Sequence, residues 1–383
     1  MKAEEIKQLT VIGAGVMGHG IAELAALAEL QVSLYDISDK LVQQGRQRIQ
    51  GSLSKLAQKG LITPEQAQGA LARLKPLSRL EEALRQADFV IEAAPEVLQL
   101  KQDIFRQLDQ LAPPRAILAS NTSSLPVSQI AQVTRRPQQV VGMHFFNPPV
   151  LMALVEIIKG QQTDEATVEA TVELAKRLKK TPVVCRKDVR GFITSAIFEG
   201  FIGEAMWLVS RGEATVRQID SRMKYHEGFP MGPFELADLT GLDISDNIHR
   251  EAGLDNPPLL EELVRAGRLG RKSGRGFYDY ASGAGADYRP EEGAGFDPLP
   301  LYALMTNIAA RLLADQVTTA AEIDTAMRLG GGFPLGPLAK ADQIGLASIL
   351  NWLDEAYRRY GDERYRASPL LRELVRQGRS IGH

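Results

Sequence analysis

The residue pattern that most constrains the fold is VIGAGVMG, which places Gly13, Gly15 and Gly18 in the spacing G-x-G-x-x-G. The pattern follows a strand candidate at 8–13 and opens a helix candidate at 18–30. In that context Gly13 permits a tight turn, Gly15 lets the backbone approach a pyrophosphate, and Gly18 allows close helix–strand packing. The free N–H groups at the helix start favour an anion. The spacing therefore predicts a dinucleotide site.

Asp36 ends the next strand candidate, residues 31–36, about twenty residues after the glycines. A carboxylate at this place accepts hydrogen bonds from both adenine-ribose hydroxyls and repels a 2′-phosphate. The pattern therefore favours NAD over NADP. The alternative interpretation is a glycine-rich turn followed by a surface aspartate.

The first half of the chain alternates short β-branched runs with helical segments, which is typical of a parallel α/β sheet. The strand candidates are residues 8–13, 31–36, 87–94, 116–121, 139–146 and 153–158. From about Asp188 long helical runs such as 195–214 dominate. We therefore expect a Rossmann-type NAD-binding domain at 1–187, followed by an all-α region.

The helical region contains a repeat. IDSRMKYHEGFPMGPFELADLTGLD begins at Ile219 and IDTAMRLGGGFPLGPLAKADQIGLA begins at Ile323, 104 residues later (323 − 219). The repeat predicts two related all-α C-terminal domains, with turns at the Gly-Phe-Pro and Gly-Pro pairs. Their expected ranges are 188–283 and 298–383, joined by an exposed Gly-, Ala- and Pro-rich linker at 284–297.

Composition limits the remaining possibilities. A net charge of −2 over 383 residues gives no reason to expect a nucleic-acid or membrane partner. The single cysteine, Cys185, cannot form an intramolecular disulfide and is expected to be a small buried residue. The five histidines show no ligand spacing, so no metal site is expected. The chain starts with the charged MKAEEIK and has no long apolar run, so we expect a cytoplasmic protein.

The stretch HFFNPPVLMALVEII places one imidazole, His144, and one carboxylate, Glu156, in an apolar segment. Imidazole titrates near neutral pH and can take the proton of a hydroxyl group whose carbon loses a hydride. A buried carboxylate on the other ring nitrogen fixes the tautomer and stabilises the imidazolium. The alternative interpretation is a hydrogen-bonded core histidine and an unrelated glutamate.

Five motifs carry a family resemblance: SNTSSL at Ser120, HFFNP at His144, LVEII at Leu154, GFPMGPFELADLTGLD at Gly228 and GRKSGRGFYDY at Gly270. With the glycine motif they resemble the L-3-hydroxyacyl-CoA dehydrogenase family, as far as about Tyr280. The second helical unit resembles the tandem C-terminal domains of some members. The resemblance implies NAD as cofactor and an acyl-CoA as substrate.

The resemblance also implies roles for individual residues of the site. His144 is expected to be the general base on the 3-hydroxyl group, with Glu156 as its partner carboxylate. Ser123 is expected near the substrate oxygen and the nicotinamide, and Asn147 at the nicotinamide end of the cofactor. Taken alone, Ser123 is equally compatible with a simple turn residue.

Further contacts are implied around the site. Glu96 and Lys101 are expected to line the nicotinamide-side ribose, and Lys272 to reach the cofactor from the helical region. Ser52 and Lys59 match the coenzyme A contacts, where an ammonium suits a phosphate. Taken alone, Ser52 is equally compatible with a helix cap, and Lys59 and Lys272 with solvated charges.

One segment departs from the family pattern D-x-P-G-F-x-x-N-R. Here DVRGFITSAIF has Arg190 in place of the proline and Ser195-Ala196 in place of Asn-Arg. The family's asparagine helps to hold the substrate, whereas serine is shorter and offers one hydroxyl. Ser195 is therefore expected to line the substrate site, with a loss of about 1–3 kcal/mol if a transition-state hydrogen bond is missing.

Three functions remain open at this point. The leading one is NAD-dependent interconversion of 3-hydroxyacyl-CoA and 3-ketoacyl-CoA. The second is a dehydrogenase of a hydroxy acid that is not a thioester, and the third is a non-catalytic NAD-binding relative. The second helical unit lacks a counterpart of the GRKSGRGFYDY tail and is expected to be structural. Because a tandem copy occupies the surface that pairs single-unit relatives, the chain is expected to be a monomer or a homodimer.

Overall fold

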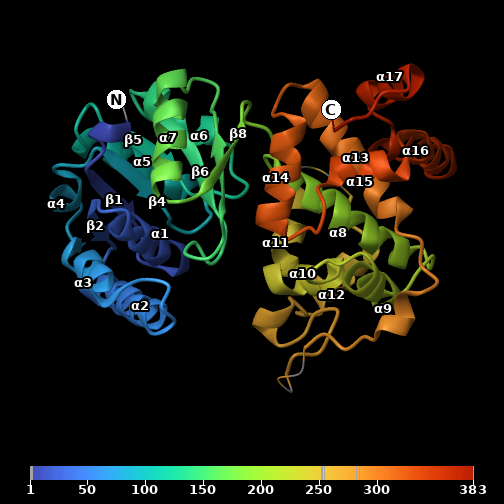
Figure 1. Cartoon of the computed structure of the whole chain (residues 1–383), viewed down its shortest axis with the longest axis horizontal. Coiled ribbons are helices and arrows are strands. Elements are labelled where there is room, and N and C mark those ends of the chain that lie inside the picture. The colour runs from blue at the N-terminus through green and yellow to red at the C-terminus, as the bar shows by residue number, and fades with distance from the viewer. Residues whose placement is uncertain (1–2, 252, 254, 282, 284, 383) are drawn as a thin grey trace. The chain divides into compact units, whose positions relative to one another are not determined.

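The computed structural model describes residues 3–251, 253, 255–281, 283 and 285–382 (Figure 1). The chain forms two compact units, residues 1–192 and 193–383. The division falls five residues after the predicted boundary at 187 (192 − 187). Residues 1 and 383, which bound the outermost predicted domains, and residue 284, which begins the predicted linker, lie outside the described residues.

The first unit is built on one eight-stranded sheet of order β3-β2-β1-β4-β5-β6-β7-β8. Its strands are β1 (Gln8–Ile12), β2 (Gln31–Tyr35), β3 (Leu74–Leu77), β4 (Phe89–Glu92), β5 (Ile117–Ser120), β6 (Val140–Phe145), β7 (Leu154–Ile158) and β8 (Thr181–Cys185). Its helices are η1 (Ala3–Glu5), α1 (Val16–Leu27), α2 (Asp39–Gln58), α3 (Pro64–Ala72), α4 (Leu80–Leu84), α5 (Leu98–Leu111), α6 (Val127–Ala131), η2 (Pro137–Gln139) and α7 (Glu165–Arg177).

The sheet is mixed, so the expectation of a parallel sheet is wrong for its last two strands. β7 runs antiparallel to β6, and β8 is parallel to β7. The reason is the short connection at residues 146–153, which contains no helix. Parallel neighbours need a crossover of a dozen or more residues, so a short loop returns the chain antiparallel.

The two strands that sequence analysis missed are the two edges of the sheet, β3 and β8. Each contains a proline, Pro76 in β3 and Pro182 in β8. Proline cannot donate to a ladder and is tolerated mainly on edge strands, where it also discourages pairing with other chains. In a short segment a proline also lowers the β-propensity that would identify a strand in the sequence.

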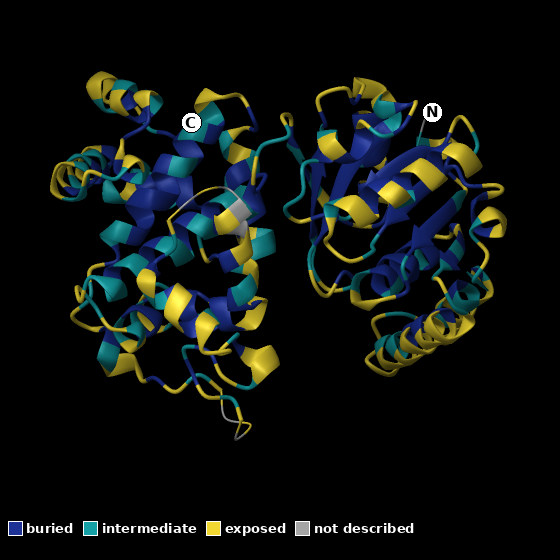
Figure 2. Cartoon of the chain, turned by 180° about the vertical axis from the view of Figure 1, so that it is seen from behind, coloured by how far each residue is buried: buried dark blue, intermediate teal, exposed yellow. Residues whose placement is uncertain are grey.

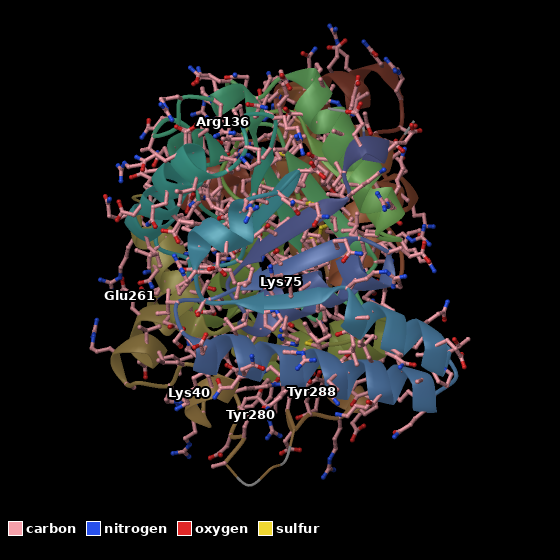
Figure 3. All side chains as sticks on the ribbon, turned by 90° about the vertical axis from the view of Figure 1, so that its left-hand side faces the viewer. Lys40, Lys75, Arg136, Glu261, Tyr280 and Tyr288 are labelled. Carbon is pink, nitrogen blue, oxygen red and sulfur yellow. The ribbon has the colours of Figure 1, made fainter. Side chains whose placement is uncertain are left out.

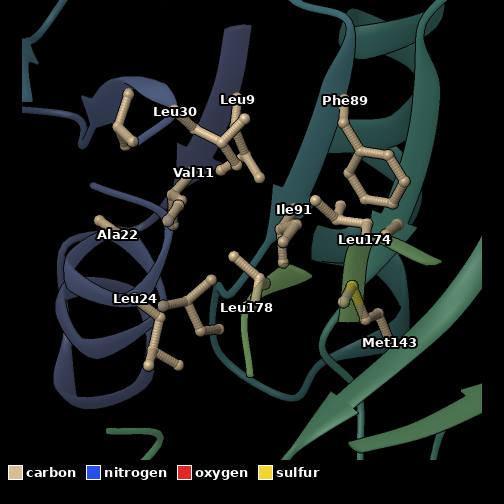
Figure 4. Close-up of a cluster of buried hydrophobic side chains, with 14 of the residues drawn as sticks. Leu9, Val11, Ala22, Leu24, Leu30, Phe89, Ile91, Met143, Leu174 and Leu178 are labelled. Atoms are coloured by element: carbon tan, nitrogen blue, oxygen red, sulfur yellow. The ribbon is translucent and has the colours of Figure 1, made fainter. Parts of the chain in front are cut away.

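Apolar side chains cover both faces of the sheet, and strands β1 and β4 to β7 are almost entirely buried, whereas β2, β3 and β8 are partly exposed (Figure 2). On one face Leu9 and Ile91 of the central strands meet Leu24 of α1 and Leu174 of α7 (Figure 4). On the other face α6 packs against β6, and α5 packs against α6. Cys185 is buried as expected, and burial raises the pKa of its thiol.

The second unit is helical. Its first copy of the repeat comprises α8 (Thr194–Ser210), α9 (Val216–Ser221), η3 (Arg222–His226), α10 (Pro233–Thr240), α11 (Leu242–Glu251), α12 (Pro258–Arg265) and η4 (Arg271–Ser273). After η5 (Pro290–Gly293), the second copy comprises α13 (Leu299–Ala314), α14 (Ala320–Gly331), α15 (Pro337–Ile344), α16 (Leu346–Tyr360), η6 (Glu363–Tyr365) and α17 (Pro369–Gln377). No helix in the described part of the chain combines the length and apolarity that crossing a membrane requires.

Equivalent aspartates fix equivalent turns in the two copies. Asp220 accepts two backbone N–H groups in the first turn of α10, and Asp324 does the same in the first turn of α15. A Cβ atom on Gly232 would lie 2.3 Å from Asp220, and one on Gly336 would lie 2.1 Å from Asp324. The Gly-Pro pair at each site is therefore explained by close approach to the capping carboxylate.

The two copies pack on each other through their Gly-Phe-Pro turns. The rings of Phe229 and Phe333 are 4.6 Å apart between centroids. Added Cβ atoms on Gly228 and Gly332 would each meet the proline of the opposite copy, Pro334 and Pro230, respectively. Because these contacts are reciprocal, the repeats form a twofold-like pair within one compact unit.

The structure adds detail to two expectations for this region. Most described residues of the predicted linker at 284–297 are exposed, but Tyr288 and Gly293 are buried, and the Tyr288 hydroxyl donates to Glu235 at 2.6 Å (Figure 3 labels Tyr288). The second copy also keeps the end of the tail motif. Asp342 accepts the N–H groups of residues 381 and 382 as Asp238 accepts those of residues 277 and 278.

Candidate active site

The glycine motif has the geometry that its spacing predicts. Gly13 has φ 99°, and a Cβ atom there would lie 2.7 Å from the carbonyl oxygen of Ala93. A Cβ on Gly18 would lie 1.8 Å from the carbonyl oxygen of Gly13, so only glycine allows α1 to pack this closely. Gly15 is the N-cap of α1 and has open space around its Cβ position. The start of α1 is thus accessible to a pyrophosphate, which fits a dinucleotide.

Asp36 directly follows β2 and is fixed beside the glycine loop. Its Oδ2 atom accepts the N–H of Ala14 at 2.8 Å, and its Oδ1 atom accepts the N–H of Ile37 at 2.8 Å. Each carboxylate oxygen retains a lone pair for a further donor. The residue is half-buried, so part of it remains accessible from solvent.

His144 and Glu156 are directly opposite residues on β6 and β7. Nδ1 of His144 lies 2.7 Å from Oε2 of Glu156, both residues are buried, and Glu156 has no exposed surface. The antiparallel return of β7 creates this pair, because opposite residues in such a ladder project to the same face. The sequence predicts the pair, but it does not predict the antiparallel register that places the two residues opposite each other.

Apolar rings surround the imidazole. The Phe146 ring centroid lies 4.5 Å from that of His144, and the Phe192 centroid lies 6.3 Å away. Phe192 is fully buried and has φ 50°, a backbone conformation that bulky side chains rarely adopt. These rings exclude water from one side of the His144–Glu156 pair.

The loop after β5 carries Ser123 and is held from two sides. Oε1 of Glu96 accepts the backbone N–H of Ser123 at 2.9 Å and the hydroxyl of Thr122 at 2.6 Å. Asn121 Oδ1 accepts the N–H of Phe145, the residue after His144, at 2.9 Å. The loop that exposes Ser123 is therefore tied to the strand that carries the imidazole.

Glu96 is itself an ionised anchor. Burial opposes its charge, but the Lys101 ammonium and hydrogen bonds from the Ser123 loop hold the pKa of Glu96 below its usual value. Lys101 is fully buried, with Nζ 2.7 Å from Oε1 of Glu92 and 3.4 Å from Oε2 of Glu96. Glu92 is not among the residues predicted from the sequence, although it is a charged residue at the end of an apolar strand.

Asn147 is exposed at the start of the β6–β7 loop, and the peptide bond to Pro148 is cis. Lys180, which is buried, holds the β6–β7 loop through hydrogen bonds to its backbone. Its Nζ atom donates to the carbonyl oxygens of Pro149 at 2.6 Å and Met152 at 2.8 Å. Lys180 is not among the predicted residues either, because a lysine next to a strand is usually a solvated charge.

Ser52 and Lys59 lie on α2 and at its C-cap, two helical turns apart. Lys59 is exposed. The Ser52 hydroxyl donates to Oε1 of Glu23 at 2.7 Å, and Glu23 is buried in α1. Burial raises the pKa of Glu23 to about 7, although the bond from Ser52 acts in the opposite direction.

Ser195 and Lys272 belong to the second unit. Ser195 is half-buried in the first turn of α8. Lys272 lies in η4, and its ammonium forms an ion pair with Asp243. In the described part of the chain, no group of three or more His, Cys, Asp or Glu side chains is placed to hold a metal ion.

Comparisons with known proteins agree with this geometry. The family model described as 3-hydroxyacyl-CoA dehydrogenase, NAD binding domain, matches residues 8–189, and the model of its C-terminal domain matches residues 191–280 and 300–381. A probable 3-hydroxybutyryl-CoA dehydrogenase of Bacillus subtilis is 44% identical over 283 residues, which cover 72% of this chain and 98% of the relative.

Other relatives span nearly the whole chain. The 3-hydroxyadipyl-CoA dehydrogenase of Escherichia coli K12 is 32% identical over 463 aligned positions, covering 96% of this chain and 97% of the relative. A crystal structure of 3-hydroxybutyryl-CoA dehydrogenase from E. coli K12 superposes with a TM-score of 0.89 at 31% identity, covering 97% of this chain and 99% of that one. The chain therefore belongs to the 3-hydroxyacyl-CoA dehydrogenase family and is an NAD-dependent oxidoreductase.

Proposed function

We propose that the protein oxidises (S)-3-hydroxyacyl-CoA to 3-ketoacyl-CoA with His144 as the general base. The observation that carries this proposal is the 2.7 Å contact between Nδ1 of His144 and Oε2 of the fully buried Glu156. A carboxylate only accepts hydrogen bonds, so Nδ1 carries the proton and Nε2 keeps its lone pair. Nε2 then takes the hydroxyl proton of the substrate, and Glu156 stabilises the resulting imidazolium.

NAD supplies the hydride acceptor when it is bound. Gly13, Gly15 and Gly18 are proposed to shape its pyrophosphate site, and Asp36 to accept hydrogen bonds from its adenine ribose. We assign the nicotinamide end to Glu96, Ser123 and Asn147, and a further contact from the second unit to Lys272. Lys101 is fully buried against Glu92 and Glu96, so we propose that it acts by holding Glu96.

For the substrate, α2 offers two groups of different chemistry. A hydroxyl has one proton, and Ser52 donates it to Glu23, so Ser52 presents lone pairs to a ligand. We propose that Ser52 accepts an amino or hydroxyl group of the coenzyme A moiety, and that Lys59 binds a phosphate. Ser195 is proposed to contact the substrate near the reacting oxygen.

The decisive experiment follows NADH oxidation with acetoacetyl-CoA and longer 3-ketoacyl-CoAs in the wild type and in His144→Ala. Because a general base contributes about 10²- to 10⁴-fold, we expect a loss of that size in kcat. Glu156→Gln is expected to approach the same loss, since an amide does not stabilise an imidazolium. The matched control is His249→Ala, which removes another buried, hydrogen-bonded histidine in the second unit.

Each result has a distinct meaning. Turnover that survives His144→Ala contradicts the role of the base, whereas an equal loss in His249→Ala points to misfolding. Activity on free hydroxy acids but on no acyl-CoA selects the second function considered above. Binding of NAD without turnover of any substrate selects a non-catalytic protein.

The oligomeric state is a separate proposal. We propose a monomer or a homodimer, because the twofold-like pairing of the repeats already occupies one helical surface within a single chain. Sedimentation at several protein concentrations tests it, and a larger assembly contradicts it.

A further inference from the structure

Three ionisable side chains form a cluster at the carboxyl ends of β4 and β5. Glu92 ends β4, and Lys101 and Glu96 lie on and just before α5. Nζ of Lys101 is 2.7 Å from Oε1 of Glu92 and 3.4 Å from Oε2 of Glu96. Two carboxylates and one ammonium leave the cluster, named the Glu92–Lys101–Glu96 cluster here, with a net charge of minus one.

The cluster is rigidly bonded. Oε2 of Glu92 accepts the Ser120 hydroxyl at 2.6 Å, and Oε1 accepts the N–H of Ala94 at 2.7 Å. Lys101 also donates to the carbonyl oxygen of Ala94 at 3.3 Å. Within the described residues, Lys101 is the one basic side chain in an ion pair with either carboxylate. The excess negative charge is therefore fixed in place and not compensated by a second cation.

The cluster opens to solvent at its Glu96 end. The side chains of Glu92 and Lys101 are fully buried, whereas that of Glu96 is 34% exposed. Glu96 also binds the backbone of Ser123, the exposed loop residue assigned above to the nicotinamide end of the cofactor. The step that follows rests on that proposed function.

Strand register places the cluster close to the catalytic pair. Glu92 pairs with Ser120 on β5, Ser120 pairs with Gly142 on β6, and His144 lies two residues beyond Gly142 on the same face. Neighbouring strands are about 4.8 Å apart, so two strand spacings, roughly 10 Å, separate Glu92 from β6. At such distances a buried charge is screened much less than a surface charge.

We propose that the Glu92–Lys101–Glu96 cluster shifts the ratio of the cofactor affinities towards oxidised NAD and away from reduced NAD. The nicotinamide ring carries a positive charge when oxidised and none when reduced. A fixed negative charge in a poorly screened site attracts only the charged form. The remaining contacts of the dinucleotide are common to both forms, so the cluster changes the ratio of their affinities.

The test measures the dissociation constants of NAD⁺ and NADH separately, by calorimetric titration of the full-length protein at one ionic strength. Glu92→Gln brings the cluster to net zero, and we expect the NAD⁺ constant to rise about three- to tenfold relative to that of NADH. Glu96→Gln also brings the cluster to net zero, but it does so at the solvent-exposed carboxylate and leaves the buried Glu92–Lys101 ion pair intact. It is expected to move the ratio in the same direction.

The double variant Glu92→Gln/Lys101→Met is the matched control. It removes both buried charges, so no unpaired ion remains in the interior, and it restores a net charge of minus one on Glu96. We expect its ratio to lie within about twofold of the wild-type ratio. The shift in the ratio then follows net charge and not the loss of a particular contact.

Two outcomes overturn the proposal. One is an unchanged ratio in Glu96→Gln, whatever happens to the folding of Glu92→Gln. The other is a ratio in the double variant that stays shifted like that of a single variant. Either result leaves the role of His144 untouched, because binding constants are measured without substrate. Conversely, turnover that survives His144→Ala does not alter the ratio.

Discussion

The side chain of Ser195 lies in the first turn of α8, where the family resemblance expects asparagine. We predict that Ser195→Asn raises kcat/KM on acyl-CoA substrates by about ten- to a hundredfold, because an amide reaches farther and offers both a donor and an acceptor. Steady-state assays with acetoacetyl-CoA measure the change. Ser348→Asn, an exposed serine near the start of α16, is the control. No gain on any acyl-CoA contradicts this account.

Glu23 links the pKa of a buried carboxyl group to stability. Burial raises the pKa of Glu23 to about 7, so the native state keeps this proton at pH values where the unfolded chain, with a pKa near 4.5, has lost it. The native state binds more protons between those two values, and the free energy of unfolding therefore falls as pH rises from about 4.5 to 7. Above pH 7 the native state carries the full free-energy cost of ionising the buried Glu23 carboxyl group.

Glu23→Gln removes that penalty and can still accept the Ser52 hydroxyl. We predict that the variant is more stable than the wild type at pH 8 by on the order of 1–3 kcal/mol, with the difference shrinking towards pH 5. Urea denaturation across this range measures it, with Glu29→Gln, whose side chain is 80% exposed, as the control. Parallel stability curves for Glu23→Gln and wild type refute the assignment.

Among the elements, the β6–β7 connection depends on one buried lysine. Lys180→Met deletes the two bonds to the carbonyl oxygens of Pro149 and Met152 and leaves both without that donor. We predict a loss of about 2–4 kcal/mol in the free energy of unfolding and a lower kcat, since the loop carries Asn147. Lys179→Met, an exposed neighbour, is the control. Hydrogen exchange in residues 146–153 should rise only in the first variant.

The elements also show what sequence patterns can predict. The six central strands follow alternating or continuous apolar runs, and each lies where the pattern placed it. The edge strands β3 and β8 are short and contain Pro76 and Pro182. These segments therefore form strands because they pair with β2 and β7, and not because of their own composition. The direction of β7 likewise depends on the length of a connection. Local periodicity contains no such information.

The candidate site divides in the same way. His144 and Glu156 could be singled out because polar groups are unexpected in an apolar segment, and Asp36 because it ends a strand about twenty residues after the glycine motif. Glu92 also ends an apolar strand, but its role, like that of Lys180, is explained only by partners far away in the sequence. In a sequence, a buried charged residue cannot be distinguished from an exposed one unless the residue that pairs with it in the fold is known.

At the scale of the whole molecule, the two copies of the repeat are expected to unfold together. We predict that Gly232→Ala and Gly336→Ala each lower the free energy of unfolding of residues 193–383 by more than about 2 kcal/mol, because the added methyl group meets a capping aspartate. Gly203→Ala, with open space around its Cβ position in α8, is the control and should be neutral or stabilising.

Circular dichroism during thermal unfolding, combined with hydrogen exchange, measures these effects. Both variants should weaken protection in both copies, since the copies share the Phe229–Phe333 contact. Separate transitions for the two copies, or damage confined to the mutated one, contradict a shared core.

The reciprocal Gly-Phe-Pro turns have a consequence for dilution. An association between separate molecules weakens as the protein becomes scarce, whereas here both contacting faces are parts of one polypeptide. The chain segment that connects the two copies sets the effective concentration of one face relative to the other. The contact between the copies therefore does not depend on the concentration of the protein. In a monomer the midpoint of thermal melting should accordingly be the same in nanomolar and micromolar samples, whereas a homodimer would melt at a higher temperature in the more concentrated sample.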